Sequence, residues 1–253
     1  MSFDETTISA AIIQGYHDKL MAQLTSDVII VGAGPSGMVA AMDLADQGRS
    51  VTVVEKRLTP GGGIWGGAMA MNELVVQPEA VPLLKQLAVR HQPAGDGLLR
   101  TDSVELAAAL TLHCVQKGAV ILNMTNVEDI CMHEQRVSGV VINRTSVSAP
   151  LPIDPLTLRS AVVVDATGHD AAVVQMVRRR GLTGGPVPAG EGPMNAVEGE
   201  HFVVDQTGEI YPGLWVCGMS VCAARGGPRM GPIFGGMLLS GRHCAEQIQK
   251  SLK

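Results

Sequence analysis

The sequence predicts an α/β fold in which a mainly parallel sheet carries one β-hairpin appendage. Short stretches rich in valine and isoleucine alternate with helical patterns, as in parallel α/β proteins. A glycine-rich turn over residues 32–37 follows the first strand and opens the next helix. Between residues 127 and 143 two short alternating strands surround His133-Glu134-Gln135, which indicates a hairpin. We therefore expect residues 1–253 to form a single α/β domain with a small hairpin insertion at about 126–145.

The elements of the first half follow from apolar spacing, capping residues and glycine-rich turns. In chain order we expect a helix over 6–23, a strand over 27–31, a helix over 35–47, a strand over 51–55, a glycine-rich loop over 60–67, a helix from 102 to about 117 and a strand over 119–123. The helix at 102 begins in Asp102-Ser103-Val104-Glu105, which resembles a capping box.

After the hairpin, the second half is expected to add two apolar strands and two helices. After the hairpin we expect a loop or sheet edge over 146–156, a strand over 161–166, a helix to about 180, a loop over 183–193, a strand over 213–218, a loop rich in glycine and arginine, and a helix over 234–252. The run Arg178-Arg179-Arg180 suits a helix end, where cations interact favourably with the helix dipole.

The composition excludes several classes of protein. The net charge is −5 and only 3% of the residues are aromatic, so we expect no nucleic-acid partner. No apolar stretch approaches the length of a membrane span, and Met1-Ser2-Phe3-Asp4-Glu5 lacks the basic start of a signal peptide. Five cysteines without framework spacing indicate reduced thiols. We therefore expect a cytoplasmic protein that does not bind membranes.

The glycine-rich turn predicts a dinucleotide site. Gly32-Ala33-Gly34-Pro35-Ser36-Gly37 matches G-x-G-x-x-G, lies between a strand and a helix, and precedes Glu55 at the next strand end. Gly32, Gly34 and Gly37 would let a pyrophosphate approach the helix N-terminus, and Glu55 would bind ribose hydroxyls. The alternative is a turn needed only for packing. An acid at this strand end favours NAD or FAD over NADP, although Lys56 weakens that preference.

Three features favour NAD over a flavin. Flavin enzymes of this class tend to end the last strand in Gly-Asp, whereas this chain has Gly218-Met219. His169 follows Ala166-Thr167-Gly168, where a flavin would pass, and aromatic residues that would sandwich a flavin ring are few.

Several blocks occur in an order that resembles one family. They are Gly32 to Gly37, Glu55-Lys56, residues 60–67, residues 102–105, Asp154-Pro155-Leu156-Thr157, residues 165–170 and residues 228–237. In this combination the chain resembles the NAD-consuming thiazole synthases of thiamine biosynthesis, from about residue 8 to 250. The resemblance implies a Rossmann-like sheet of the flavoprotein-like, two-dinucleotide-binding-domain type and a homo-octamer.

The resemblance also implies a reaction of the transferase class. NAD is a substrate: nicotinamide leaves, glycine condenses with the opened ADP-ribose, and sulfur is added to give an ADP-thiazole carboxylate. Some members donate sulfur from their own cysteine, and others use sulfide with Fe(II). The position that separates the branches holds Pro152, which has no thiol, so we expect external sulfide. Cys217 or Cys222 as a substitute donor is the alternative.

The resemblance assigns site residues one by one. Asp154 and His169 would hold the Fe(II), although spacing alone favours a turn aspartate and a capping histidine. Arg229 would bind the glycine carboxylate, with Arg225 as a nearby competitor. The expected nucleotide contacts are Gly32, Gly34, Ser36, Gly37, Glu55, Lys56, Gly63, Val127, Pro152, Ile153 and Met219.

The spacing of the metal pair predicts a site shared between subunits. Most of the chain between Asp154 and His169 is expected to be extended, which separates the two residues by roughly 30 Å. Two ligands of one ion need backbones within roughly 10 Å. We therefore expect Asp154 to reach the His169 of an adjacent subunit. A flavin oxidoreductase and a non-catalytic NAD-binding protein remain as other functions.

Overall fold

The computed structural model describes residues 3–146, 155–182 and 190–252. Pro152, Ile153 and Asp154 lie outside these ranges, as does most of the loop expected over 183–193.

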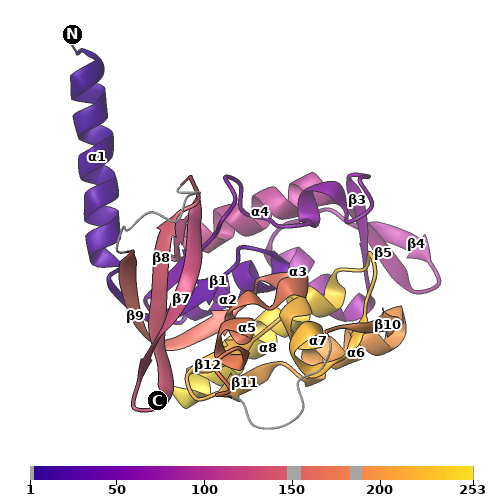
Figure 1. The fold of residues 1–253 in the computed structure, drawn as a ribbon. Helices are drawn as coiled ribbons and strands as arrows, with labels where there is room; N and C mark the ends of the chain where they lie inside the picture. Colours follow the sequence, from indigo (N-terminus) through magenta and orange to yellow (C-terminus); the bar gives the residue numbers. More distant parts are fainter. Residues whose placement is uncertain (1–2, 147–154, 183–189, 253) are drawn as a thin grey trace.

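The central sheet confirms the predicted parallel α/β class (Figure 1). Five parallel strands lie side by side in the order β12 (Leu214–Val216), β9 (Leu156–Asp165), β1 (Thr25–Val31), β2 (Val51–Val54) and β6 (Val120–Leu122). Strand β11 (Gly208–Tyr211) pairs antiparallel with β12 at one edge. Val28 to Val31 in β1 and the whole of β2 are buried, as expected for central strands covered on both faces.

Each face of this sheet packs against its own group of elements. On one face, Val28, Ile30 and Val53 pack with α2 (Pro35–Asp46), α3 (Val81–Gln86), α4 (Ser103–Gln116) and α8 (Gly235–Ser251). On the other, Ile29 and Val163 pack with β7 (Thr125–His133), β8 (Arg136–Arg144), α5 (Ala172–Arg178) and α7 (Met219–Arg225). The strands β7 and β8 form the predicted hairpin, and their positive-φ residues Glu134 and Gln135 make the turn.

Strand β9 begins earlier than the expected residue 161. Its first half alternates between exposed and buried residues and pairs with β8, from Leu156 opposite Ile142 to Arg159 opposite Gly139. Its second half is continuously buried between β1 and β12. Only the buried half was predicted, because the alternating half follows a proline-rich stretch of the sequence.

The stretch after Gly218 was wrongly expected to be a loop. It forms the helix α7, in which Met219, Ser220, Val221, Cys222, Ala223 and Ala224 are all buried. Burial all round leaves no amphipathic period to recognise. The helix stops at Gly226, whose φ of +74° is left-handed.

Several small elements had no counterpart in the sequence analysis. They are α3 and β11, named above, and η1 (Ile64–Gly66), β3 (Glu73–Val76), η2 (Pro78–Ala80), β4 (Gln92–Gly95), β5 (Leu98–Asp102), η3 (Gly168–Asp170), β10 (Gly192–Met194), α6 (Ala196–Asp205) and β13 (Pro228–Arg229). Strands β3, β5 and β4 form a separate antiparallel sheet, and β10 pairs with β13. These elements are too short to give a clear apolar period.

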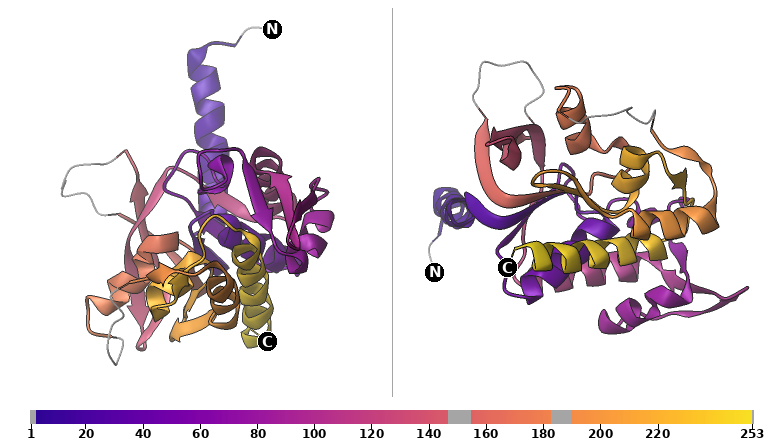
Figure 2. Two further views of the ribbon diagram at one scale, coloured as in Figure 1. Left: turned by 90° about the vertical axis from the view of Figure 1, so that its right-hand side faces the viewer. Right: turned by 90° about the horizontal axis from the view of Figure 1, so that it is seen from below.

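The N-terminal helix α1 (Glu5–Ala22) stands away from the rest of the molecule (Figure 2). The Asp4 side chain caps it by accepting a hydrogen bond of 2.8 Å from the Thr7 amide. The helix has no buried residue, and Tyr16 contacts the hairpin through Arg144. Among the described residues, no helix is both long enough and apolar enough to cross a bilayer.

Candidate active site

A cavity of about 720 Å³ opens beyond the carboxyl ends of β1, β2 and β9. This is the edge where open α/β sheets bind ligands, and the chain order reverses here because β2 and β9 flank β1 on opposite sides. The residues expected at the site that line the cavity are Gly32, Gly34, Ser36, Glu55, Lys56, Gly63, Val127, His169, Met219 and Arg229. One cavity thus brings together much of the expected nucleotide site and two of the three expected reactive residues, His169 and Arg229.

The glycine-rich turn has the geometry that the motif predicts. A Cβ on Gly32 would lie 2.4 Å from the Ala166 oxygen, and one on Gly37 would lie 2.1 Å from the Gly32 oxygen. These two glycines are therefore required for packing, and Gly37 lies beneath the cavity wall. Gly34 faces open space at the N-cap of α2 and borders the cavity. The helix N-terminus is thus accessible to an anion.

Glu55 connects the strand end to the glycine-rich turn. It is 6% exposed, its Oε2 accepts a hydrogen bond of 2.8 Å from the Ala33 amide, and its Oε1 accepts one of 2.8 Å from the Arg57 amide. A carboxylate has about four acceptor positions, so each oxygen can still accept from a ribose hydroxyl. Besides its expected role in binding, this residue holds the turn in place, which the motif alone does not reveal.

The loop that carries His169 is fixed by the buried side chain of Asp165. Its Oδ1 accepts hydrogen bonds from the Thr167 amide at 3.0 Å, the Thr167 hydroxyl at 2.7 Å and the Ser220 hydroxyl at 3.0 Å. Its Oδ2 accepts one of 2.9 Å from the Val174 amide. With four donors, the carboxylate is satisfied without a ligand. Asp165 therefore shapes the site from beneath.

His169 and Arg229 meet at a carboxylate that the sequence analysis did not identify. The His169 Nδ1 lies 2.7 Å and 2.9 Å from Oε1 and Oε2 of Glu191. The Arg229 Nε lies 3.4 Å from Oε2 of the same residue. The Glu191 side chain is 10% exposed, whereas His169 is 59% and Arg229 is 52% exposed. Glu191 lies in a stretch rich in glycine and proline, where no pattern marks a functional residue.

The structure separates the two candidate arginines. Arg229 lies on β13, where it pairs with Met194 of β10, and its side chain lines the cavity. Arg225 ends α7, is absent from the cavity wall and donates a hydrogen bond of 3.1 Å to the Glu209 carbonyl. Arg229 is therefore the arginine placed to meet a ligand in the cavity.

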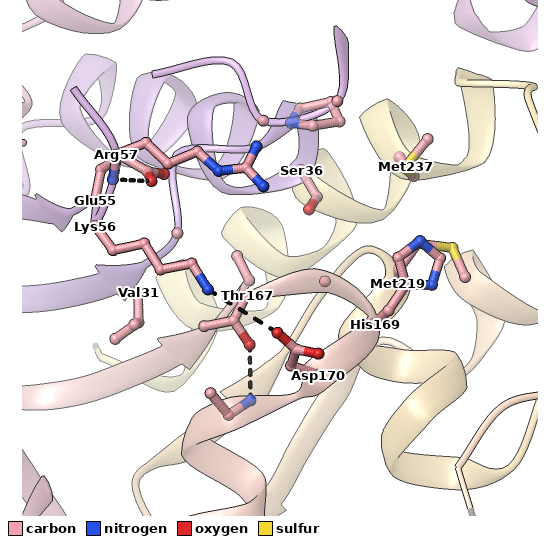
Figure 3. Close-up of a pocket in the computed structure, with 18 of the residues that line it drawn as sticks. Val31, Ser36, Glu55, Lys56, Arg57, Thr167, His169, Asp170, Met219 and Met237 are labelled. Carbon is pink, nitrogen blue, oxygen red and sulfur yellow. Dashed lines mark hydrogen bonds and ion pairs between the residues drawn. The ribbon is translucent and has the colours of Figure 1, made fainter. Parts of the chain in front are cut away.

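The remaining wall combines polar and apolar side chains (Figure 3). Lys56 follows β2 and Asp170 lies in η3 after β9, and their side chains point toward one another, with 4.0 Å between Nζ and Oδ2. Both are largely exposed, so this pair contributes little to stability. Met219, Phe234 and Met237 add apolar surface to the cavity. Lining residues not expected from the motifs include Arg57, Thr125, Asn126, Thr167 and Asp170.

Of the two expected metal ligands, only His169 lies within the described residues. His169 presents an exposed imidazole to the cavity, and an imidazole whose Nδ1 bonds a carboxylate is a common form of metal ligand. Asp154 lies outside the described residues. Within the described ranges, no three His, Cys, Asp or Glu side chains form a cluster able to hold an ion.

Comparison with known proteins identifies the family. A model of the Thi4 family matches residues 9–234. The chain belongs to the Thi4 family. It is 47% identical to the thiamine thiazole synthase of Thermotoga maritima, and the alignment covers 100% of each chain. It is 48% identical to that of Pyrococcus horikoshii, over 98% of each chain. The crystal structure of THI4 from Thermovibrio ammonificans superposes with a TM-score of 0.94 at 41% identity, covering 100% of this chain and 99% of the other.

These matches agree with the resemblance drawn from the motifs. This member of the Thi4 family has the Rossmann-like α/β fold, and it is an enzyme of thiamine thiazole biosynthesis.

Proposed function

We propose that the protein converts NAD, glycine and sulfide to an ADP-thiazole carboxylate with release of nicotinamide, using bound Fe(II). The observation that carries this proposal is the shared cavity, which is lined by the glycine-rich turn, His169 and Arg229. A non-catalytic nucleotide-binding protein would need only the first of these. The reacting part of NAD would lie between the turn and the two side chains.

The nucleotide half of NAD would bind beside the glycine-rich turn. The pyrophosphate would lie at the N-terminus of α2 beside Gly34 and Ser36. Ribose hydroxyls would donate to Glu55, while Lys56, Gly63, Val127 and Met219 would contact the rest of the molecule, together with Pro152 and Ile153. Support comes from the buried Glu55 carboxylate, which retains acceptor capacity toward the cavity.

Asp154 and His169 would hold the Fe(II). An imidazole and a carboxylate suit this borderline ion. When bound, the ion would act as a Lewis acid on the condensed substrate, with positions left open for sulfide and substrate. His169 and Arg229 share the partner Glu191, so a ligand of His169 and a carboxylate on Arg229 would lie near one another.

Arg229 would bind the glycine carboxylate. A guanidinium offers two parallel N–H donors that match a carboxylate, and such charged hydrogen bonds are stronger than neutral ones. The Glu191 contact involves Nε. The Nη1 and Nη2 groups have no hydrogen-bond partner among the described residues, which supports a role in binding substrate.

Sulfur would come from outside the protein. Pro152 has no thiol at the position of the family's cysteine donors. The two candidate substitutes, Cys217 and Cys222, are both 0% exposed. Burial, together with the nearby Glu191 charge, raises the pKa of the Cys222 thiol to about 12. A buried thiol that remains protonated is a poor nucleophile, which supports repeated turnover with sulfide.

We further propose a homo-octamer whose sites are shared between adjacent subunits. Strand β9 is extended over ten residues between the positions of Asp154 and His169, roughly 33 Å at 3.3 Å per residue. Helix α1 exposes Ile8, Ile12, Ile13 and Met21. Most of the stability of a helix in a protein comes from packing of its apolar side chains, and α1 buries none, so these side chains suit contact with another copy.

We place the protein in the cytoplasm. Cys114, Cys131, Cys217, Cys222 and Cys244 all have unpaired thiols. Thiols persist in reducing compartments, and an enzyme that uses sulfide and Fe(II) needs such conditions.

The direct test of this function is mass spectrometry of the small molecule retained after anaerobic purification. An ADP-thiazole or an ADP-ribose–glycine adduct is expected. Retained FAD would contradict the proposal and indicate a flavin oxidoreductase.

A further inference from the structure

Among the described residues, Glu191 is the one carboxylate that contacts both His169 and Arg229. It immediately precedes β10, whose Gly192 amide donates a hydrogen bond of 2.8 Å to the Gly227 carbonyl. The pairing of β10 with β13 also fixes Arg229. Glu191 thus lies directly before β10, next to Arg229 on the neighbouring strand β13, and its carboxylate extends to His169.

The contact with His169 has a chemical consequence. An ionised carboxylate only accepts hydrogen bonds, so the neutral imidazole must carry its proton on Nδ1 to donate to Glu191. Nε2 then holds the lone pair, and no described residue bonds to it. A metal ligand requires such a lone pair, and a carboxylate behind the ring raises its basicity.

The contact with Arg229 pairs the Glu191 carboxylate with a cation. A carboxylate that is nine-tenths buried is costly to ionise unless cations or donors face it. The Arg229 guanidinium lies 3.4 Å from Oε2 and supplies the positive charge. Arg229 thus holds the Glu191 carboxylate in place, and that carboxylate faces Nδ1 of His169.

We propose that Glu191 is a positioning residue that fixes the Nδ1–H form of His169 and directs its Nε2 lone pair to the metal. The proposal rests on the proposed function, because it takes His169 as the metal ligand. It adds a residue that neither the motifs nor their spacing indicate. The simpler reading is that the three side chains only tie residues 190–194 to the loop after β9.

The experiment compares Glu191→Ala, Glu191→Gln and the control Glu198→Ala. Glu198 is an exposed carboxylate nearby on α6, and it contacts Asn195 rather than the site. A glutamine retains a carbonyl oxygen that can accept from Nδ1–H, whereas alanine retains no acceptor. If Glu191 positions His169, Glu191→Gln should keep most of the tautomer preference and metal affinity that Glu191→Ala loses.

The first measurement is made on the metal-free protein. Solid-state ¹⁵N spectra of labelled histidine at about pH 8.5, above the ordinary imidazole range, report the tautomer of each ring. The His169 signal is assigned by its loss in His169→Asn. The wild type, the control and Glu191→Gln should show the Nδ1–H form, and Glu191→Ala should show both tautomers. An unchanged tautomer in Glu191→Ala would overturn the proposal.

The second measurement is the affinity for Co(II), titrated by its visible absorbance as a substitute for Fe(II). Loss of such a supporting partner typically weakens metal binding by about 10- to 100-fold. We expect that loss in Glu191→Ala, a smaller one in Glu191→Gln and none in Glu198→Ala. If Glu191→Ala binds Co(II) as the wild type does, the proposal is wrong even in a protein that makes the thiazole. If no variant makes a thiazole, the tautomer and Co(II) results still decide the role of Glu191.

Discussion

The Asp165 carboxylate accepts a hydrogen bond of 3.0 Å from the Ser220 hydroxyl, which joins the end of β9 to the start of α7. Ser220 in turn accepts from the Gly168 amide at 3.0 Å, one residue before His169. The loop that carries the imidazole is therefore held from the sheet by two buried polar side chains. Substitutions at Asp165 or Ser220 should therefore lower the stability of the fold, even though neither residue takes part in the reaction.

Asp165→Asn should destabilise the fold. An asparagine offers one carbonyl oxygen to four donors and places an NH₂ group where a donor already points. Each buried donor left unpaired costs about 1–3 kcal/mol. Urea unfolding should show a loss in this range or above, and Ser220→Ala, which removes one partner, should lose less. Equal stability of Asp165→Asn and the wild type would show that the network is not formed.

Glu200 should make stability depend on pH. Burial raises the pKa of its carboxyl to about 7, while its usual value is 4.5. The folded state therefore holds a proton that the unfolded state releases between these values. Stability from this group is full below about pH 4.5 and is lost as the pH rises through about 7, by at most about 3 kcal/mol.

Glu200→Gln should remove this dependence. Its carbonyl oxygen can still accept the hydrogen bond of 2.7 Å that the Gly236 amide donates. Chemical unfolding between about pH 4.5 and 8 should give a flatter stability curve than the wild type. The exposed Glu198→Gln on the same helix serves as the control and should keep the wild-type slope. A wild-type slope in Glu200→Gln would refute the assignment.

Arg229→Lys should weaken the use of glycine while nicotinamide release survives. Lysine keeps the charge but loses the planar pair of donors. Loss of a charged hydrogen bond costs about 1.5–3 kcal/mol, so the glycine KM should rise by roughly 10- to 100-fold. Arg225→Lys is the matched control, because Arg225 contacts the Glu209 carbonyl away from the cavity. If the two variants behave alike, the carboxylate is bound elsewhere.

Shared sites predict complementation between inactive subunits. Asp154→Ala and His169→Ala should each be inactive alone. When the two are mixed at equal amounts by reversible dissociation, about a quarter of the sites should combine an intact Asp154 with an intact His169. Activity should return to about that fraction of the wild type, and each variant treated alone should stay inactive. Mixed oligomers without activity would place both ligands in one chain.

Much of the fold could be predicted because its signals are local. The buried runs of β1 and β2, the glycines at 32–37 and the hairpin turn at Glu134-Gln135 each follow from a few adjacent residues. Helix α7 and the small sheet of β3, β5 and β4 could not be predicted. The first is buried all round. In the second, β3 pairs with β5 across 23 to 29 residues, and β4 is exposed throughout, so it has no apolar pattern.

The site also contains both residues that could be predicted from the sequence and residues that could not. Gly34, Glu55, His169 and Arg229 lie on motifs, and the structure places all four on one cavity. Glu191 and Asp165 act through partners that are distant in sequence, at positions 169, 229 and 220. Such contacts exist only once the strands are assembled, so neither spacing nor composition indicates them.

The most direct test of the proposed function is a count of products per chain. The protein is supplied without oxygen with NAD, glycine, Fe(II) and sulfide, and both nicotinamide and ADP-thiazole are measured against protein concentration. We predict many equivalents of each per chain, and continued sulfide-dependent activity when all five cysteines are replaced. One equivalent per chain, with the protein losing the mass of one sulfur atom, would contradict the account and show that a cysteine is the donor.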